Sequence, residues 1–431
     1  MPSIWQIRRA EPERAASLAR ATGLHPLTAQ VLLHRGIDEP SAVECFLHPR
    51  LDSLSDPAAL PDLTRGLARM KRAIEKREPI LIFGDSDLDG LTASVILSEV
   101  LAALGAIVQV QSSNRLRDGY GLPPSFVRQL DRSTTRLVIL VDCGTNQAEA
   151  IRELSEAGIE TIVVDHHIPL DGWAEPCALI NPHRTDSSGR PQTASFGTPV
   201  AHPSRLASLS EAAGVPGLGR ELCSAGLAFK VAQGLLGAQA LATLPRYLDL
   251  AALGTLSDCV PLIGDNRIIV SEGLARILQS HRPGLRRLCE ATQTTQANPE
   301  HIVRRLAPRL NASGRLGDPS AVRHLLRSDD SPDAEAWMAQ TQEAHTTTKR
   351  LYRQMMAEAE SQVHRQHFRD QFIMVVTQTG WHQGLTGILA SQLAARYGRP
   401  AIAIALDEHR GIGSGRSIPR FNLLDALKAC Q

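Results

Sequence analysis

Short apolar runs alternate with longer amphipathic runs through the middle of the sequence, from about residue 79 to residue 167. Four runs have the length and composition of buried strands: "PILIFGD", "IVQVQSS", "RLVILVDCG" and "IETIVVDHH". The intervening segments "TASVILSEVLAALGA" and "NQAEAIRELSEAG" have the apolar spacing of helices. This alternation is typical of βαβ units, so it predicts an α/β fold with a parallel sheet.

The chain has 431 residues, too many for one compact core, and its pattern changes along the sequence. The N-terminal part is helical in pattern, with breaks at Pro26, Pro40 and Pro49. A later stretch rich in Ser, Pro and Gly is typical of a long loop. We expect, in order, a helical lead-in (1–66), a first α/β domain (67–330) with an inserted loop (183–219), one long connecting helix (331–366) and a smaller α/β domain (367–431).

Acidic residues stand directly after three of the predicted strands: Asp85, Asp142 and Asp165. In open α/β sheets, ligands bind outside the carboxyl ends of the strands. The sequence therefore predicts that these three carboxylates meet at the edge of the sheet where a binding site is expected.

The stretch "LIFGDSDLDGLTA" places Asp85, Asp87 and Asp89 at alternate positions before Gly90. The spacing resembles the start of an EF-hand calcium loop, but the twelfth position is Ile96, which cannot chelate, and a strand precedes the loop. Taken alone, the stretch is also compatible with a solvated turn. Acidic and histidine residues elsewhere in the sequence decide whether this stretch is a turn or half of a metal site.

Asp165 is followed by His166 and His167, and Asp258 stands in an apolar stretch where a free carboxylate is costly to bury. Carboxylate oxygens with imidazole suit Mn²⁺ or Mg²⁺ better than zinc. Without cations such a cluster repels itself and raises its own pKa values. These residues indicate a site for two divalent ions, which activate water and neutralise charge at a phosphorus centre.

Cationic and small residues elsewhere fit a phosphate ligand. "RRLAPRLNASGRLGD" carries Arg304, Arg305, Arg309 and Arg315, which either bind phosphate or form a solvated basic helix face. "GIGSGRSIPRF" predicts a small-residue loop that brings backbone amides near an anion. Before a predicted helix, "GWHQGLTG" supplies an aromatic ring that either stacks on a base or belongs to a core.

Composition adds limits rather than a function. The formal net charge of +1 argues neither for nor against a nucleic-acid partner. The seven cysteines are scattered without a C-x-x-C pair, which disfavours a disulfide framework or a zinc knuckle and favours a reducing cytoplasm. The charged N-terminus does not resemble a signal peptide, and we expect no run of about 18 apolar residues that spans a membrane.

The motifs together resemble the DHH phosphoesterases, and within them the RecJ family of single-strand-specific exonucleases. "GDSDLDG", "VDCG", "VVDHH" with "INP", "DLAALGTLSDCVPLIGDNR" and "PRLNASGRLGD" are similar to successive RecJ motifs. "NRLRDGYGL" and "LCSAGLAFK" also resemble RecJ segments, and "GWHQGLTGILASQLAARYGRP" with "GSGRSI" resembles the DHH-associated C-terminal domain. The likeness runs in order from about residue 60 to residue 427.

The resemblance implies a Mn²⁺- or Mg²⁺-dependent enzyme that degrades single-stranded DNA from its 5′ end in DNA repair and recombination. It implies that Asp165 orients a neighbouring His, that His167 stabilises charge at phosphorus or protonates the leaving oxygen, and that Asp142 bridges the two ions. It further implies that a single-strand-binding protein and a helicase are partners. The implied metal ligands are Asp85, Asp87, Asp89, Asp142, His166 and Asp258. The implied nucleic-acid contacts are Arg309, Asn311, Arg315, Trp381, His382, Ser414 and Arg416.

Some features depart from the family pattern. Position 86 is Ser where the family usually carries an aromatic residue, and the insertion at 183–219 is longer than expected. The glycine-glycine-histidine motif and the oligonucleotide-binding barrel expected after it are missing, so we expect the smaller domain to be incomplete. Two alternatives stay open: a phosphodiesterase of short oligonucleotides or cyclic dinucleotides, and a non-catalytic nucleic-acid-binding scaffold.

Overall fold

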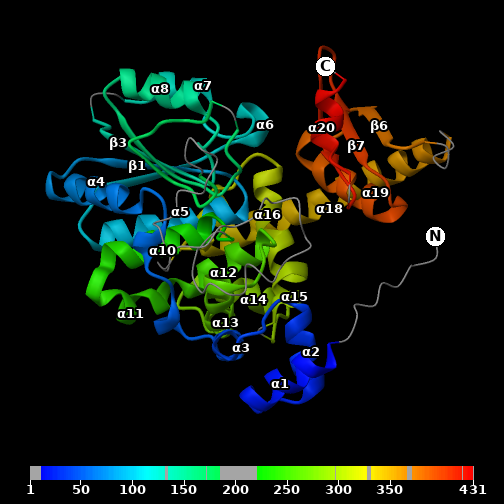
Figure 1. Cartoon of the computed structure of the whole chain (residues 1–431). Helices are drawn as coiled ribbons and strands as arrows, with labels where there is room; N and C mark the ends of the chain where they lie inside the picture. The colour runs from blue at the N-terminus through cyan, green and yellow to red at the C-terminus, as the bar shows by residue number, and fades with distance from the viewer. Residues whose placement is uncertain are drawn as a thin grey trace.

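The computed structural model describes residues 11–131, 134–170, 172–184, 221–296, 298–327, 332–365, 371–419 and 421–430. Most of the expected insertion at 183–219 therefore lies outside the described residues. A five-stranded parallel sheet in the order β2-β1-β3-β4-β5 forms the centre of the larger part (Figure 1), which confirms the predicted α/β fold. The strands are β1 (Ile80–Gly84), β2 (Val108–Ser112), β3 (Leu137–Val141), β4 (Glu160–Val164) and β5 (Ala178–Ile180). The short edge strand β5 was not expected.

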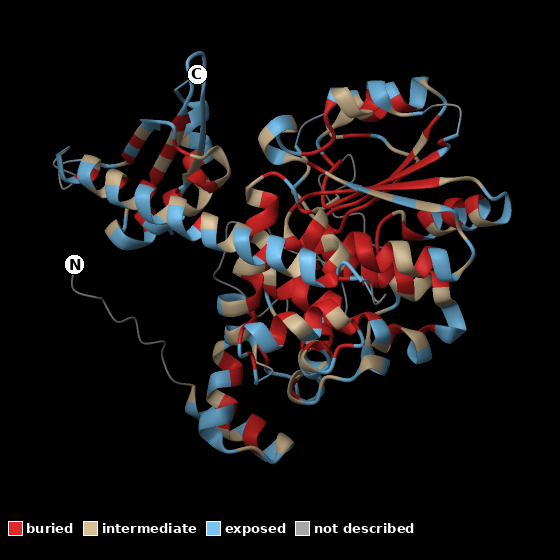
Figure 2. Ribbon diagram, turned by 180° about the vertical axis from the view of Figure 1, so that it is seen from behind, coloured by how far each residue is buried: buried red, intermediate tan, exposed pale blue. Residues whose placement is uncertain are grey.

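Both faces of this sheet are covered by helices, which explains why its inner strands are apolar at every position. Ile82 and Ile139 point into the main core, while their neighbours Phe83 and Leu140 point into the core on the opposite face. The main core contains α4 (Leu63–Glu75), α5 (Leu88–Ala103), α10 (Ser224–Leu236), α12 (Leu248–Ser257) and α13 (Gly264–Leu278). The opposite face is covered by α7 (Pro124–Gln129) and α8 (Ala148–Glu156). Buried residues concentrate in the sheet and these central helices (Figure 2).

One helical run, Ser224–Ser257, is long and apolar enough to cross a membrane by length and composition alone. No such run was expected from the sequence, so that expectation was wrong. Half of its most apolar window is buried inside the protein, and side chains such as Phe229 and Leu253 are fully buried in the main core. Packing in this core accounts for the apolar character of the run.

The predicted helical lead-in consists of three helices with a small core of their own. Pro26 and Pro40 do not end helices but begin them, because proline is tolerated in the first turn, where no amide donor is needed. Beyond these helices, Ser55 donates its backbone amide and hydroxyl to the buried carboxylate of Asp265, at 3.0 and 2.6 Å, and fastens the lead-in to the main core. The elements here are α1 (Pro12–Thr22), α2 (Pro26–His34), α3 (Pro40–Leu47), η1 (Leu51–Ser53) and η2 (Pro57–Ala59).

Shorter helices complete the larger part. A π-helical segment, η5, runs directly into α16, so all four arginines of the arginine-rich stretch lie in helical segments. These elements are α6 (Arg115–Asp118), η3 (Gly237–Gln239), α11 (Ala240–Thr243), η4 (Leu244–Tyr247), α14 (Pro283–Ala291), α15 (Pro299–His301), η5 (Ile302–Leu306), α16 (Ala307–Arg315) and α17 (Ser320–Leu325).

A single long helix, α18 (Ala334–Arg365), leads from the larger part to a second sheet (Figure 1). The end of α18 contributes Met355, Ala359 and Val363 to a separate apolar core. "GIGSGR" is the antiparallel edge strand of this sheet and not the expected loop; its small residues are needed because a Cβ at Gly413 would lie 2.8 Å from the Ala403 carbonyl. The elements are β6 (Met374–Thr379), η7 (Gln383–Leu385), α19 (Thr386–Tyr397), β7 (Ala401–Leu406), β8 (Gly411–Arg416) and α20 (Leu423–Lys428). The division into domains stays a prediction.

Candidate metal centre

The register of the parallel strands brings three acids to one edge of the sheet. Gly84 pairs with Val141, and Val141 with Val164, so the residues that follow them are also neighbours. The ladder continues one step further: the amide of Asp85 donates to the Val141 carbonyl at 3.1 Å, and the amide of Asp142 donates to the Val164 carbonyl at 3.0 Å. The expected meeting of carboxylates at this edge is therefore present.

The first turn of α5 adds two more acids. The helix begins at Leu88, earlier than the sequence suggested, because Asp87 caps it by accepting the amides of Asp89 and Gly90. Gly90 permits this tight entry, since a Cβ there would lie 2.7 Å from the Asp85 carbonyl oxygen. Asp89 faces inward and is buried.

The N-terminus of α10 holds the carboxylate of Asp89 from the other side. The amides of Ser224 and Ala225 donate to its two oxygens at 2.7 and 2.8 Å. Ser224 also donates its hydroxyl to Asp142 Oδ1 at 2.9 Å. Because the free amides of a helix N-terminus favour negative charge, α10 stabilises this buried pair of acids.

His166 lies at the centre of the carboxylates. Its Nε2 is 3.4 Å from Asp142 Oδ1, 3.7 Å from Asp258 Oδ2 and 3.8 Å from Asp89 Oδ2. Asp258 directly follows α12, so it comes from a helix and not from the sheet. One imidazole therefore faces carboxylates from three separate segments of the chain.

The potential ligand atoms form three groups whose members lie within 4.8 Å of one another. The groups are Asp85 with Asp87 and Asp142, Asp89 with His166 and Asp258, and Asp142 with His166 and His167. Asp142 and His166 each belong to two of them. The donors are carboxylate oxygens and imidazole nitrogens, the set that Mn²⁺ and Mg²⁺ accept, so the residues present fit the predicted ions.

Crowding of these acids shifts their protonation. Burial, and then repulsion by Asp87, Asp89 and Asp85, raises the pKa of Asp142 well above its usual range. Burial raises the pKa of Asp258 to about 7, with repulsion by Asp89 and Asp87 adding to it. Negative charge is thus unfavourable here without a cation, which is the behaviour expected of a metal site.

Asp165 is paired with His167. Its Oδ1 lies 2.7 Å from His167 Nδ1 and also accepts the amide of His166 at 2.8 Å. Burial opposes the charge of Asp165, but the hydrogen bond and the charge of His167 outweigh it and lower the pKa of Asp165 to about 2. Burial opposes the charged imidazole as well, yet Asp165 holds the pKa of His167 above its usual value. The predicted orienting contact of Asp165 is present.

Asp85 has partners that the sequence did not suggest. Its buried carboxylate accepts the Ser113 hydroxyl at 2.7 Å and two donors of the Arg115 guanidinium, Nε at 3.1 Å and Nη2. Arg115 Nη2 also donates to Asp87 Oδ2 at 3.0 Å. In this arrangement a side-chain cation neutralises part of the acidic cluster.

Within the arginine-rich stretch, Asn311 and Gly314 make structural contacts with the rest of the protein. Asn311 accepts the Leu88 amide at 2.8 Å and donates to Ser257 Oγ at 3.0 Å, so both polar atoms are engaged within the protein. The expectation that Asn311 binds phosphate is therefore not supported by its geometry. A Cβ at Gly314 would lie 2.1 Å from the Ser86 carbonyl oxygen, so the small residue serves packing against the acidic loop.

The two candidate arginines of α16 differ in their surroundings. Arg309 donates to the Arg305 carbonyl at 2.6 Å. Burial lowers the pKa of Arg315, and repulsion by Arg115 adds to this while Asp87 opposes it. Arg315 thus lies within electrostatic reach of the acidic cluster, as a residue that contacts a bound phosphate would.

The predicted nucleic-acid contacts in the smaller part differ in their surroundings. Trp381 is only 6% exposed, packs in the second core and donates its indole N–H to Glu358 at 2.6 Å, so it is a core residue and not a stacking platform. His382 is half-buried, and its Nδ1 has no hydrogen-bond partner among the described residues. Ser414 and Arg416 lie on β8; a Cβ at Gly387, near the start of α19, would lie 3.5 Å from Ser414 Oγ and 3.4 Å from Arg416 Nη2.

The smaller part contacts the larger part beside the acidic cluster. Gln383 donates its side-chain amide to the Leu116 carbonyl at 2.7 Å, next to Arg115. A Cβ at Gly384 would lie 2.1 Å from the Arg315 carbonyl oxygen, so η7 packs closely on the end of α16.

Three further residues of the site were missed by sequence reasoning: Arg115, Tyr120 and Ser224. The Tyr120 hydroxyl lies 3.0 Å from His167 Nδ1 and donates to the Asp142 carbonyl at 3.2 Å. The signal that could have found these residues was the likeness of "NRLRDGYGL" and "LCSAGLAFK" to RecJ segments, which contain all three.

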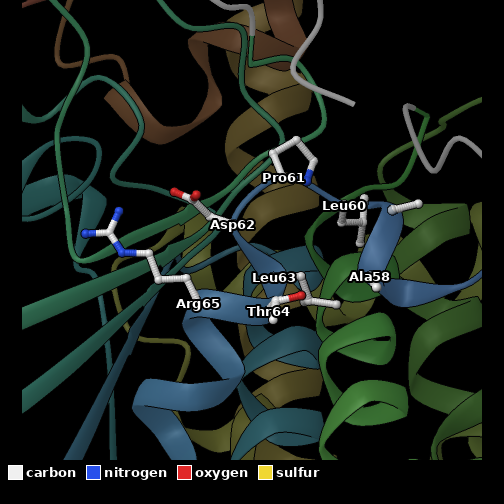
Figure 3. A pocket seen from close by; sticks show the side chains of 8 residues that line it. Ala58, Leu60, Pro61, Asp62, Leu63, Thr64 and Arg65 are labelled. Atoms are coloured by element: carbon white, nitrogen blue, oxygen red, sulfur yellow. The ribbon is translucent and has the colours of Figure 1, made fainter. Parts of the chain in front are cut away.

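A cavity of about 320 Å³ lies at the start of α4, away from the acidic cluster. It is lined by residues 58–65 (Figure 3), none of which belongs to the candidate ligand groups. Asp62 accepts the Leu179 amide at 3.1 Å and pairs with Arg184, so its carboxylate has a structural role. The chemistry of the acidic cluster, rather than this cavity, identifies the functional site.

The chain is similar to known proteins. Residues 79–255 match the family model described as "DHH family, N-terminal domain". The chain is 34% identical over 432 residues to the single-stranded-DNA-specific exonuclease RecJ of Bacillus subtilis, covering 99% of this chain and 51% of that protein. It is 32% identical to RecJ of Dickeya dadantii, covering 99% of this chain and 72% of the relative. The chain thus spans between about half and three quarters of the length of these relatives.

Solved structures are similar as well. A crystal structure of exonuclease RecJ bound to manganese has a TM-score of 0.70 and 31% sequence identity, covering 86% of this chain and 85% of that one. The RecJ structure in complex with Mn²⁺ from Thermus thermophilus has a TM-score of 0.75 and 28% identity, covering 98% of this chain and 56% of that one.

Proposed function

The chain belongs to the RecJ family of single-stranded-DNA-specific exonucleases, and on that premise we propose that it hydrolyses phosphodiester bonds of single-stranded DNA from the 5′ end. The observation that supports this most directly is the position of His166, whose Nε2 lies 3.4–3.8 Å from carboxylates of three segments. Such a set of donors suits two Mn²⁺ or Mg²⁺ ions. When bound, ions of this kind activate water and neutralise charge at phosphorus.

The side chains then take distinct roles in the proposal. Asp142 and His166 each belong to two ligand groups, and Asp142, whose carboxylate has two oxygens, is the residue proposed to hold both ions. Asp165 orients His167, which stabilises the developing charge or gives a proton to the leaving oxygen. Arg309, Arg315 and Arg416 are proposed to hold backbone phosphates, since guanidinium groups bind them bidentately. The proposed ligands are Asp85, Asp87, Asp89, Asp142, His166 and Asp258.

We propose a cytoplasmic role in DNA repair and recombination. A single-strand-binding protein and a helicase are the proposed partners, because an enzyme that needs single strands depends on proteins that expose or coat them. Co-purification with each partner on a partly unwound duplex tests this; digestion that no helicase increases would contradict it.

The decisive experiment is digestion of 5′-phosphorylated single strands labelled at one end or the other, with and without Mn²⁺. We expect the 5′ label to be released first as a mononucleotide, and only with the metal. Release of the 3′ label first would refute the polarity. Cleavage of dinucleotides alone would favour the alternative phosphodiesterase, and Mn²⁺ binding without any cleavage would favour the scaffold.

A further inference from the structure

Tyr120 contacts both Asp142 and His167 at the metal centre, and none of the roles above uses it. It lies in the segment between α6 and α7, flanked by Gly119 and Gly121 at φ +78° and +82°, a backbone conformation that favours glycine. The side-chain amide of Gln147 fixes this segment by accepting the Leu122 amide at 3.0 Å and donating to the Leu122 carbonyl at 3.2 Å. The side chain of Gln147 therefore fixes the backbone on the C-terminal side of Tyr120.

The Tyr120 hydroxyl lies against the face of the His167 ring. Its oxygen is 3.0 Å from Nδ1 and 3.3 Å from Nε2, distances too short for a position in the ring plane beyond the carbon that joins the two nitrogens. The two rings meet edge to face, with centroids 5.3 Å apart. The same hydroxyl donates its proton to the backbone carbonyl of Asp142 at 3.2 Å. The contact thus links the His167 ring to Asp142, one of the two residues that belong to two ligand groups.

One hydrogen bond does not by itself fix the imidazole ring of His167. The side chain of His167 is 42% exposed, and Asp165 holds it through Nδ1 alone. A ring that is bonded at Cγ and held by a single hydrogen bond at Nδ1 can still rock about its Cβ–Cγ bond. The Tyr120 hydroxyl against the ring face limits this rocking, as preorganisation of a catalytic group requires.

We propose that Tyr120 is a positioning residue that acts through His167, holding the imidazole ring in the orientation in which it gives a proton to the leaving 3′ oxygen. This inference rests on the proposed function. In that reaction a water oxygen forms the new bond to phosphorus and its proton passes to solvent. The bond from phosphorus to the 3′ oxygen breaks, that oxygen receives the proton from His167, and His167 is protonated again by solvent.

Replacing the leaving oxygen by sulfur separates this role from a structural one. A thiolate leaves without a proton, so a single strand with a 3′-sulfur linkage does not need an oriented His167. With Mn²⁺ as the metal, we expect Tyr120→Phe to lower kcat on the ordinary strand by roughly 10- to 100-fold. On the sulfur-linked strand we expect a change within about twofold. Equal losses on both strands, or none on the ordinary strand, would overturn the proposal.

Tyr352→Phe is a matched control, because Tyr352 packs against the second core on α18. It should leave both rates unchanged. In a double-mutant cycle, Tyr120→Phe should cost nothing further once His167→Ala is present, since Tyr120 acts only through that ring. Additive losses would count against the inference.

A readout without catalysis distinguishes failure of this inference from failure of the proposed function. With ¹⁵N-labelled histidine, the ring-nitrogen signals of His167 in the metal-free protein should shift in Tyr120→Phe and not in Tyr352→Phe. Unchanged His167 signals would overturn the positioning role whether or not the wild type digests DNA. If the wild type is inactive but the His167 signals still differ between wild type and Tyr120→Phe, only the proposed function is overturned.

Discussion

Asn311 accepts a hydrogen bond at 2.8 Å from the backbone amide of Leu88, a residue 223 positions away in the sequence. Its other polar atom donates to Ser257 Oγ at 3.0 Å, directly before Asp258. One side chain of α16 therefore joins the start of α5 to the end of α12. The acids that these two helices contribute to the metal centre depend on this junction.

Asn311→Ala should weaken the metal centre rather than the grip on DNA. Two partially buried polar groups lose their partner, so we expect the free energy of unfolding to fall by about 1–3 kcal/mol and Mn²⁺ affinity to fall several-fold. Urea unfolding and calorimetric titration with Mn²⁺ measure the two effects. Asn298→Ala, which removes the side-chain cap at the start of the helical run that carries Asn311, serves as the control for metal affinity. Lost DNA affinity with normal Mn²⁺ binding would restore the phosphate role.

Arg115→Ala should destabilise the metal-free protein. The variant leaves the fully buried Asp85 without its cation, while the 39% exposure of the Arg115 side chain lets solvent screen part of the loss, so we expect about 1–3 kcal/mol. Saturating Mn²⁺ should recover most of this. Arg117→Ala, which removes an exposed neighbouring arginine paired with Asp118, should have little effect. Urea unfolding with and without Mn²⁺ measures these effects. A loss of unfolding free energy that is the same with Mn²⁺ as without it would contradict the prediction.

Asp142→Asn should have opposite effects on stability and on activity. Asparagine tolerates the φ of +60° at this position and still accepts the Ser224 hydroxyl. Removing one charge relieves the repulsion that raises the pKa of Asp142, so the metal-free variant should be more stable by about 1 kcal/mol or more. Exonuclease activity should fall roughly 100-fold or more. Thermal unfolding in EDTA and a single-strand digestion assay test the two effects. Mn²⁺ titration tests the bridging role, which unchanged Mn²⁺ binding would refute.

Protonation of Asp258 should make metal-free stability depend on pH. The folded protein holds the pKa of Asp258 at about 7, above the value of 3.8 for an unperturbed carboxyl group. A raised folded pKa gives stability that is complete below the unfolded pKa and is lost as pH rises to the folded pKa. Relative to Asp258→Asn, the wild type should therefore lose stability between about pH 4 and pH 7 and change no further above it.

Thermal unfolding of both proteins in EDTA across this range measures the difference. The stabilisation by Mn²⁺ should grow over the same range, because the ion binds the deprotonated carboxylate. A constant difference between wild type and variant from about pH 5 to pH 8 would contradict the raised pKa.

Sequence patterns located most elements because the signals were local. Apolar runs at 80–84 and 137–141 are strands, and the polar stretch at 331–366 contains the single helix α18. Three residues are too few for a periodic pattern, so β5 was not expected. "GIGSGR" was taken for a loop because glycine-rich strands resemble loops, and only its pairing with β7 distinguishes them.

The sequence by itself determined that acids follow strands β1, β3 and β4, because the end of a buried strand is a local feature, and His166 and His167 stand in the same motif. It did not determine what each side chain touches. Arg115 reaching Asp85, Asn311 joining two helices and Trp381 turning into a core depend on contacts between segments far apart in the chain. Such contacts depend on how helices pack on the sheet. Only the tertiary structure therefore showed that Asn311 joins two helices and that Trp381 lies in a core, where the sequence left a phosphate ligand and a base-stacking ring open.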